Sequence, residues 1–256
     1  MPRPYNTTDL DPESTFERHV FHRDVFAHFL RWTHVLREAR IGDSVVDFGC
    51  GRGNLLEVLY RNRFRPSRYV GFDIREQTIA NAREKFAGIT KFRVEFHAVD
   101  LVQTPVAAFE QLNADKVCSF EVLEHVGKQN AAAFLDRFMA CGSPDATYYL
   151  STPNYDAHVG AADNHTYDSG DGRGRVPQEF EFDETLAAVL AAGFEVQRVF
   201  GTFASQRDYV QAMTAEQAVV YEQLKEYYDS NLVSNIMAAI MPARLARNAL
   251  WVMKRA

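Results

Sequence analysis

The stretch Val46-Asp47-Phe48-Gly49-Cys50-Gly51-Arg52-Gly53 decides the fold. It follows on from a short apolar run of strand character, Ser44–Phe48, and Asn54–Asn62 after it has the pattern of a helix. Glycine lets the backbone turn sharply and lets a ligand approach without a clash with Cβ. The spacing is G-x-G-x-G, and Asn54 breaks the dinucleotide pattern G-x-G-x-x-G. The segment predicts a strand, turn and helix that hold a ligand, with a bare turn as the alternative.

Strands and helices alternate along the rest of the chain. Apolar runs predict strands at 69–73, 92–96, 115–120, 146–151, 194–200 and 248–253, and helical periodicity marks 77–86, 131–140 and 183–192. This alternation is typical of a parallel sheet with right-handed crossovers. We expect an α/β, Rossmann-like fold with a seven-stranded, mostly parallel sheet and helices on both faces. The last two strands should form an antiparallel edge pair.

The expected organisation has four parts. Residues 1–41, rich in aromatics at helical spacing, form an N-terminal helical cap, and residues 42–203 form the core. Within the core, the polar, glycine-containing stretch 155–179 lacks periodicity and suggests a lid loop. Residues 204–246 form a helical insertion before the last core strand at 247–256. The insertion fits either a cover over the site or the surface of a homodimer.

Composition narrows the class of protein. A net charge of −6 over 256 residues argues against bulk binding to nucleic acid, which needs clustered lysine and arginine. The three cysteines, Cys50, Cys118 and Cys141, have neither paired nor metal-site spacing and suit buried positions in a reducing compartment. No apolar run reaches the length of about 18 residues that spans a bilayer, and the first residues lack a signal peptide's apolar segment. We expect a cytoplasmic protein without a membrane partner.

Three acids stand next to predicted strand ends. Asp73 ends the second strand, 20 residues after Gly53, where a carboxylate can accept hydrogen bonds from a ribose diol. Asp100 follows the third strand, where it could face an adenine amino group, and Asp47 lies in the first strand beside the glycines. Ligands of open α/β sheets bind at the carboxyl ends of the strands. Together these acids indicate a nucleoside site.

The same residues resemble the motifs of class I S-adenosylmethionine (SAM)-dependent methyltransferases, over about residues 44–200. Val46–Gly53 is similar to the first motif, Asp73 to the acid of the second, Val99-Asp100-Leu101 to the third and Ala114–Val126 to the fourth. The resemblance implies SAM as cofactor. It also implies cofactor contacts from Asp47, Gly49, Gly51, Gly53, Asp73, Ile74, Asp100, Leu101 and Glu121.

A second cluster follows the fourth strand. If a helix starts at once, Glu121, Glu124 and His125 lie at i, i+3 and i+4 on one face. Two carboxylates and an imidazole suit Mg²⁺, Mn²⁺, Fe²⁺ or Zn²⁺, with His165 or His158 as a further ligand. The pattern is similar to two metal-using branches of the family, ubiquinone-biosynthesis O-methyltransferases and Hen1-like small-RNA 2′-O-methyltransferases. There the metal makes the attacking hydroxyl more acidic.

Without a metal, His125 would act as general base, with Glu121 and Glu124 beside the reacting centre. We therefore expect a methyltransferase that acts on an oxygen, rather than a nitrogen, of a small molecule or modified nucleoside. One alternative is a Hen1-like RNA 2′-O-methyltransferase, which the net negative charge of the chain disfavours. Another is a non-catalytic SAM-binding subunit. An NAD-dependent oxidoreductase would need glycine in place of Asn54.

Overall fold

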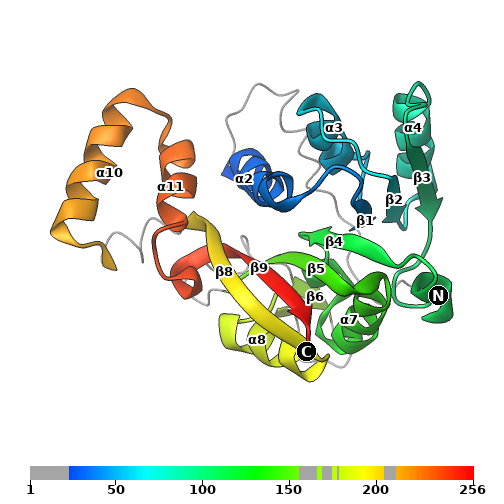
Figure 1. The fold of residues 1–256 in the computed structure, drawn as a ribbon. Coiled ribbons are helices and arrows are strands. Elements are labelled where there is room, and N and C mark those ends of the chain that lie inside the picture. The colour runs from blue at the N-terminus through cyan, green and yellow to red at the C-terminus, as the bar shows by residue number, and fades with distance from the viewer. Residues whose placement is uncertain (1–22, 156–165, 169–174, 178, 205–211) are drawn as a thin grey trace.

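The computed structural model describes residues 23–155, 166–168, 175–177, 179–204 and 212–256. A mixed sheet in the order β3-β2-β1-β4-β5-β9-β8 forms its centre (Figure 1). The strands are β1 Ser44–Phe48, β2 Arg68–Asp73, β3 Arg93–Ala98, β4 Ala114–Phe120, β5 Gly142–Pro153, β8 Phe194–Ala204 and β9 Ala246–Arg255. Only β9 runs antiparallel to its neighbours, β5 and β8. The expected seven-stranded, mostly parallel sheet is confirmed, and so is the antiparallel pairing of its last two strands.

Helices cover both faces of the sheet, as expected. One apolar layer joins the sheet to α5, α7 and α8, and a second joins the other face to α2, α3 and α4. The described helices are α2 Arg23–Glu38, α3 Asn54–Arg61, α4 Glu76–Phe86, α5 Ala107–Glu110, α6 Leu123–Val126, α7 Ala131–Ala140, α8 Phe182–Ala191, α10 Ala215–Tyr227 and α11 Ser230–Ala238. Two 3₁₀ turns, Lys128–Asn130 and Ala243–Leu245, join neighbouring elements.

Phe48, the last residue of β1, is the centre of the first layer. Its fully buried ring lies 5.4 to 5.8 Å from the rings of Phe72, Phe109, Phe134 and Phe138, three of them edge-on. Aromatic pairs in such geometry contribute beyond the area that they bury. This cluster fixes the end of β1, and so the start of the glycine turn, against α5 and α7.

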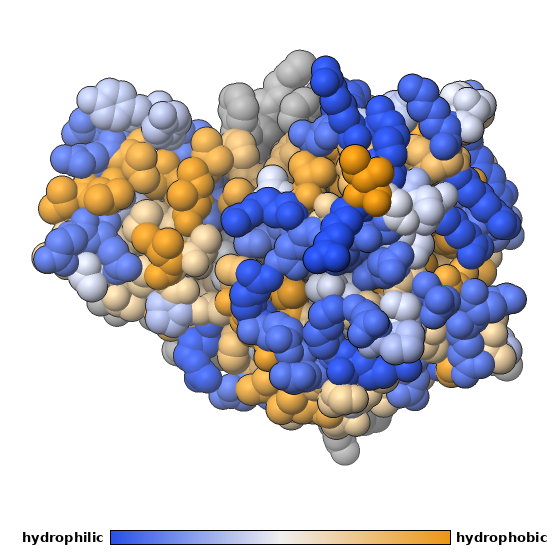
Figure 2. All heavy atoms as spheres, viewed as in Figure 1, coloured by the Kyte–Doolittle hydropathy of each residue, from blue (hydrophilic) through white to orange (hydrophobic). Residues whose placement is uncertain are grey.

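Two helices, α10 and α11, lie in the stretch expected to form an insertion. Helix α11 packs on β8 and α2, whereas α10 packs mainly on α11 and projects from the body (Figure 1). Figure 2 shows hydrophobic side chains gathered on these two helices, where Val219, Val220, Tyr227 and Ile236 are exposed. No described helix has the length and apolar character needed to cross a membrane.

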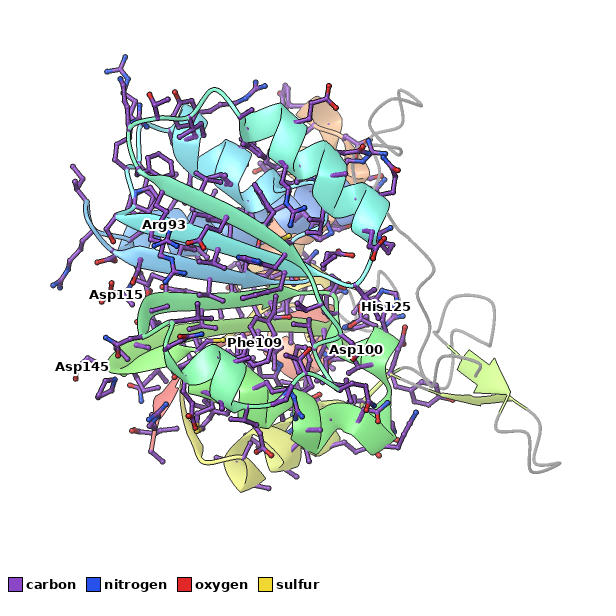
Figure 3. All side chains as sticks on the ribbon, turned by 90° about the vertical axis from the view of Figure 1, so that its right-hand side faces the viewer. Arg93, Asp100, Phe109, Asp115, His125 and Asp145 are labelled. Carbon is purple, nitrogen blue, oxygen red and sulfur yellow. The ribbon has the colours of Figure 1, made fainter. Side chains whose placement is uncertain are left out.

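The stretch expected as a lid loop contains a short hairpin. Strands β6 Thr166–Asp168 and β7 Arg175–Pro177 pair antiparallel. Strands of three residues are too short to show an alternating pattern, so periodicity does not predict them. Figure 3 shows the hairpin beyond the end of the sheet that carries Asp100 and His125.

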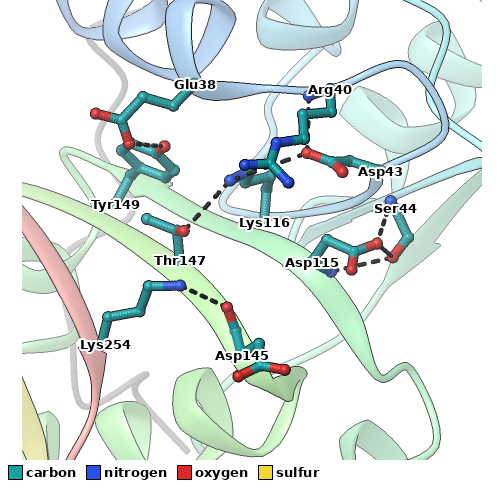
Figure 4. Close-up of polar contacts among 10 residues, drawn as sticks. All are labelled: Glu38, Arg40, Asp43, Ser44, Asp115, Lys116, Asp145, Thr147, Tyr149 and Lys254. Carbon is teal, nitrogen blue, oxygen red and sulfur yellow. Dashed lines mark hydrogen bonds and ion pairs between the residues drawn. The ribbon is translucent and has the colours of Figure 1, made fainter.

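Polar contacts close the opposite end of the sheet (Figure 4). The Asp115 carboxylate, at the start of β4, accepts hydrogen bonds from the backbone N–H and the hydroxyl of Ser44, at 2.8 and 2.7 Å. Farther along the sheet, the hydroxyl of Tyr149 on β5 donates to Glu38 of α2 at 2.7 Å. The bonds between Ser44 and Asp115 join the starts of β1 and β4.

A substitution of Gly49 tests how tightly the turn packs. Its φ is +72°, and a Cβ there would lie 2.2 Å from Cγ2 of Val122. We expect Gly49→Ala to lower the free energy of unfolding by about 3 kcal/mol. The alanine would have to adopt a left-handed backbone conformation, and its Cβ would also clash with Val122. Gly42→Ala is the matched control, because its φ is +94° but no atom lies within 4 Å of the new Cβ. Its cost should be about 1 kcal/mol. Equal urea midpoints for the two variants would contradict this packing.

Candidate functional site

The glycine turn joins β1 to α3. Two of its glycines are packed closely against neighbouring residues, and one borders open space. The N–H groups of Gly49 and Cys50 donate to the Phe72 carbonyl of β2, at 2.7 and 2.9 Å. Gly53 caps α3 at φ +79°, and a Cβ there would meet ring atoms at 2.5 Å. Gly51 differs, because a Cβ added to it would have no heavy atom within 4 Å. The first and third glycines serve packing, and Gly51 borders open space.

Asp73 ends β2 directly beside this turn. One carboxylate oxygen accepts from the Gly51 N–H at 3.2 Å, and the other accepts from the N–H of Arg75 at 2.9 Å and from its Nε at 3.2 Å. Burial raises the pKa of Asp73, while hydrogen bonds from the backbone of Arg75, Gly51 and Ile74 hold it down. The carboxylate is therefore fixed at the open edge of the glycine turn.

Asp47 lies beneath the turn and is 4% exposed. Its carboxylate accepts a hydrogen bond from the Tyr69 hydroxyl at 2.6 Å. Burial raises its pKa to about 7, the Tyr69 hydrogen bond opposes this rise, and the charge of Asp73 adds to it. The expected contact between Asp47 and the cofactor stays a prediction, because in this structure the side chain is enclosed by protein.

Asp100 follows β3 and closes a turn. One carboxylate oxygen accepts from the N–H groups of Val102 and Gln103, at 2.9 and 3.0 Å. The N–H of Val99 donates to the Asp73 carbonyl at 2.9 Å, so the ends of β2 and β3 are joined. Leu101 is buried below this turn. The turn that carries Asp100 is thus joined to the end of β2, at the end of the sheet that also carries His125 (Figure 3).

Glu121 comes directly after β4 and adopts a left-handed backbone conformation, φ +56°. One carboxylate oxygen accepts from Nη1 of Arg31, on α2, at 2.6 Å and from the Ser151 hydroxyl, on β5, at 2.8 Å. The other accepts from the amide of Asn248, on β9. Arg31 is 1% exposed and Glu121 18%. Three elements besides β4 therefore hold this one carboxylate.

The helix that was expected to begin at Glu121 begins at Leu123 instead. The prediction that Glu121, Glu124 and His125 share a helical face is wrong, because the left-handed conformation of Glu121 places it outside the helix. Glu124 is buried and accepts from the Thr152 hydroxyl at 3.2 Å. Its other oxygen lies 3.8 Å from Nε2 of His125.

In the described part of the chain, the two carboxyls are not arranged as metal ligands. Burial, followed by the charges of Glu121 and Glu179, raises the pKa of Glu124 well above its ordinary value, which favours the uncharged acid. Glu121 is already bound by Arg31, Ser151 and Asn248, so neither carboxyl is a ready anionic ligand. The described residues contain no group of three or more metal-ligating side chains. His165 and His158 lie outside the described residues.

Sequence reasoning did not identify the partners of Glu121. Arg31 lies on a helix expected only as a cap, and Ser151 and Asn248 lie on strands whose pairing the sequence does not specify. A second buried ion pair was also missed, in which Arg247 donates to Glu179 at 2.7 Å and to the Asn154 carbonyl at 2.7 Å. Charged residues inside apolar stretches are the only signal that could have found these pairs.

Comparison with known proteins identifies the family. A family model described as a methyltransferase domain matches residues 21–199, more than half of the chain. The chain belongs to this methyltransferase family. Membership in this family implies SAM as the methyl donor. No curated protein matches the chain.

Solved structures share the fold. A SAM-dependent methyltransferase from Mesorhizobium loti is 19% identical, with a TM-score of 0.57 over 91% of this chain and 100% of that one. A chain from the Haloferax volcanii complex of the Trm112 methyltransferase activator with a methyltransferase is 18% identical, with a TM-score of 0.58 over 95% and 92%. A SAM-dependent methyltransferase from Clostridium acetobutylicum is 9% identical, with a TM-score of 0.58 over 95% and 96%.

The raised pKa of Asp47 predicts a pH dependence. Between its ordinary pKa of 3.8 and about 7, the folded protein holds a proton that the unfolded chain has released. The contribution of Asp47 to the free energy of unfolding therefore falls as pH rises through this window and is flat above it. We expect Asp47→Asn to remove this slope, so that the variant gains about 4 kcal/mol relative to wild type between about pH 4 and pH 8. If the free energies of unfolding of wild type and Asp47→Asn, measured with urea, changed in parallel with pH, this prediction would be contradicted.

The buried pair predicts strong coupling between Arg31 and Glu121. Arg31→Leu should lower the free energy of unfolding by about 3 kcal/mol, because it leaves a mostly buried carboxylate without its cation. In a Glu121→Gln background the same change should cost at least about 1 kcal/mol less. Arg198→Leu, which removes the 54% exposed partner of Glu38, is the control and should cost less than about 1 kcal/mol. Additive single effects in denaturant unfolding would argue against the pair.

Proposed function

We propose that this methyltransferase transfers the methyl group of SAM to an oxygen of a small molecule or modified nucleoside, with His125 as proton acceptor. The observation that carries the proposal is the carboxylate of Asp73 fixed beside Gly51, whose Cα faces open space. A nucleoside needs both features, an acceptor for its ribose diol and a backbone that it can approach closely.

The cofactor residues follow from this placement. Asp73 would accept from the ribose hydroxyls, and Gly51 would lie against the nucleoside. Ile74, Asp100 and Leu101 would border the adenine, since the Val99 hydrogen bond holds their turn beside Asp73. Gly49, Gly53 and Asp47 would support the turn from below, through packing and the bond to Tyr69.

The remaining chemistry requires alignment and one proton transfer. Bound SAM supplies a sulfonium whose methyl carbon is already electrophilic. Glu121, held by Arg31, Ser151 and Asn248, would fix the cofactor side of the site. His125 is one-fifth exposed and lies at the same end of the sheet. An imidazole titrates near neutral pH and suits removal of a hydroxyl proton as the oxygen attacks the methyl carbon.

Glu124 would act as a positioning residue for this base. Its carboxyl lies 3.8 Å from Nε2 of His125, and burial raises the pKa of Glu124, which favours the uncharged acid beside the imidazole. The proposal requires no metal, because the carboxyls of Glu121 and Glu124 are engaged as described. Treatment with a chelator should leave the methylation rate unchanged.

Calorimetric titration tests the cofactor site. Asp73→Ala should weaken binding of SAM and of S-adenosylhomocysteine by about tenfold or more, because hydrogen bonds to a charged group are lost. The control is Asp145→Ala, an exposed acid at the opposite end of the sheet. Unchanged affinity in Asp73→Ala would remove the basis of the proposal.

The proposed role of His125 as base predicts how the rate of methyl transfer depends on pH. In a screen of hydroxyl-bearing acceptors, kcat should rise with pH through a single ionisation, because a base accepts a proton only in its neutral form. His125→Gln should lower kcat by about a hundredfold or more and remove that ionisation, while SAM affinity stays the same. If the variant retains the wild-type profile, His125 is not the base.

A further inference from the structure

The proposed ribose acceptor is already occupied by a side chain of the same chain. Oδ1 of Asp73 accepts two hydrogen bonds from one residue, the backbone N–H of Arg75 at 2.9 Å and its guanidinium Nε at 3.2 Å. Oδ2 accepts from the N–H of Gly51 at 3.2 Å. A carboxylate oxygen offers about two lone pairs. Oδ1 therefore has no place for a further donor while Arg75 remains bound.

The donors to Asp73, which include the backbone N–H of Ile74, differ in how easily they can leave. The N–H of Gly51 belongs to the packed glycine turn, and the backbone of Arg75 is the first residue before α4, where its carbonyl accepts from Ile79 at 3.1 Å. Neither backbone group can move without disturbing an element. The Arg75 guanidinium is attached to a flexible stem, and its side chain is 28% exposed, against 9% for Asp73. It is the one side-chain donor, whereas the N–H groups of Gly51, Ile74 and Arg75 belong to the backbone.

We infer that Arg75 is a displaceable stand-in for the ribose diol, and that cofactor binding replaces its Nε on Asp73 with a ribose hydroxyl. This inference rests on the proposed function and adds a residue that sets cofactor affinity. In the free enzyme Arg75 positions the carboxylate and offsets its charge. On binding, the broken Arg75–Asp73 contact subtracts from the affinity of any ligand that carries the diol.

Removal of the guanidinium should therefore tighten binding. A partly exposed ion pair is worth little, so in Arg75→Met the dissociation constant for S-adenosylhomocysteine should fall about two- to fivefold. The methionine keeps an apolar stem and leaves both backbone donors in place. The 2′,3′-dideoxy analogue of S-adenosylhomocysteine, which cannot compete for Oδ1, should bind wild type and Arg75→Met equally.

Two controls separate displacement from other effects. Arg61→Met removes an exposed cation that pairs with Glu57 on α3, and it should leave both dissociation constants unchanged. S-adenosylhomocysteine lacks the sulfonium charge of SAM, so a gain for this ligand does not arise from weaker repulsion of a cation. Calorimetry or competition against a fluorescent nucleoside provides the readout for each pair.

The outcomes distinguish this inference from the proposed function. Unchanged or weaker binding of S-adenosylhomocysteine by Arg75→Met would overturn the displacement, even if Asp73→Ala abolishes binding and so supports the cofactor site. An equal gain for the dideoxy analogue would overturn it as well, since that ligand has no hydroxyl to replace Nε. If Asp73→Ala leaves affinity unchanged, the proposed function itself fails.

Discussion

Two backbone hydrogen bonds, from the N–H groups of Gly49 and Cys50 to the Phe72 carbonyl, join the end of β1 to the end of β2. They set the direction in which the chain leaves β1, and this direction places Gly51 within reach of Asp73. The sheet order reverses at this point, with β2 on one side of β1 and β4 on the other. Ligand sites of open α/β sheets lie where the order reverses. The left-handed glycines make the turn possible, and the aromatic cluster around Phe48 keeps it in place.

Buried charge organises the neighbouring strand end in a different way. Glu121 departs from the ordinary backbone region at a cost of about 1 kcal/mol, and Arg31, Ser151 and Asn248 offset that cost with hydrogen bonds. Because these donors come from α2, β5 and β9, helix α2 and the end of β4 are one structural unit. The charge of Glu121 then acts on Glu124, whose carboxyl it helps to keep protonated.

Local patterns predicted most of the fold. The glycine turn, the βα alternation and the acids at the ends of β2 and β3 are signals within a few neighbouring residues, and the sheet order agrees with them. The error at Glu121 has a physical cause, since nothing in Phe120-Glu121-Val122 announces a non-glycine residue in the left-handed region. The contacts that explain it come from residues 90 positions earlier and 127 positions later in the chain. A single sequence does not reveal such distant partners, and the expected helical face shared by Glu121, Glu124 and His125 is wrong for this reason.

The account depends on SAM lying across the glycine turn, and a crystal structure of the complex with S-adenosylhomocysteine tests this most directly. We expect the ribose hydroxyls within hydrogen-bond distance of Asp73, the nucleoside against Gly51, and the sulfur facing the ends of β1 and β4. A ligand bound elsewhere, or the Arg75 guanidinium still on Asp73 with the ribose turned away, would contradict it.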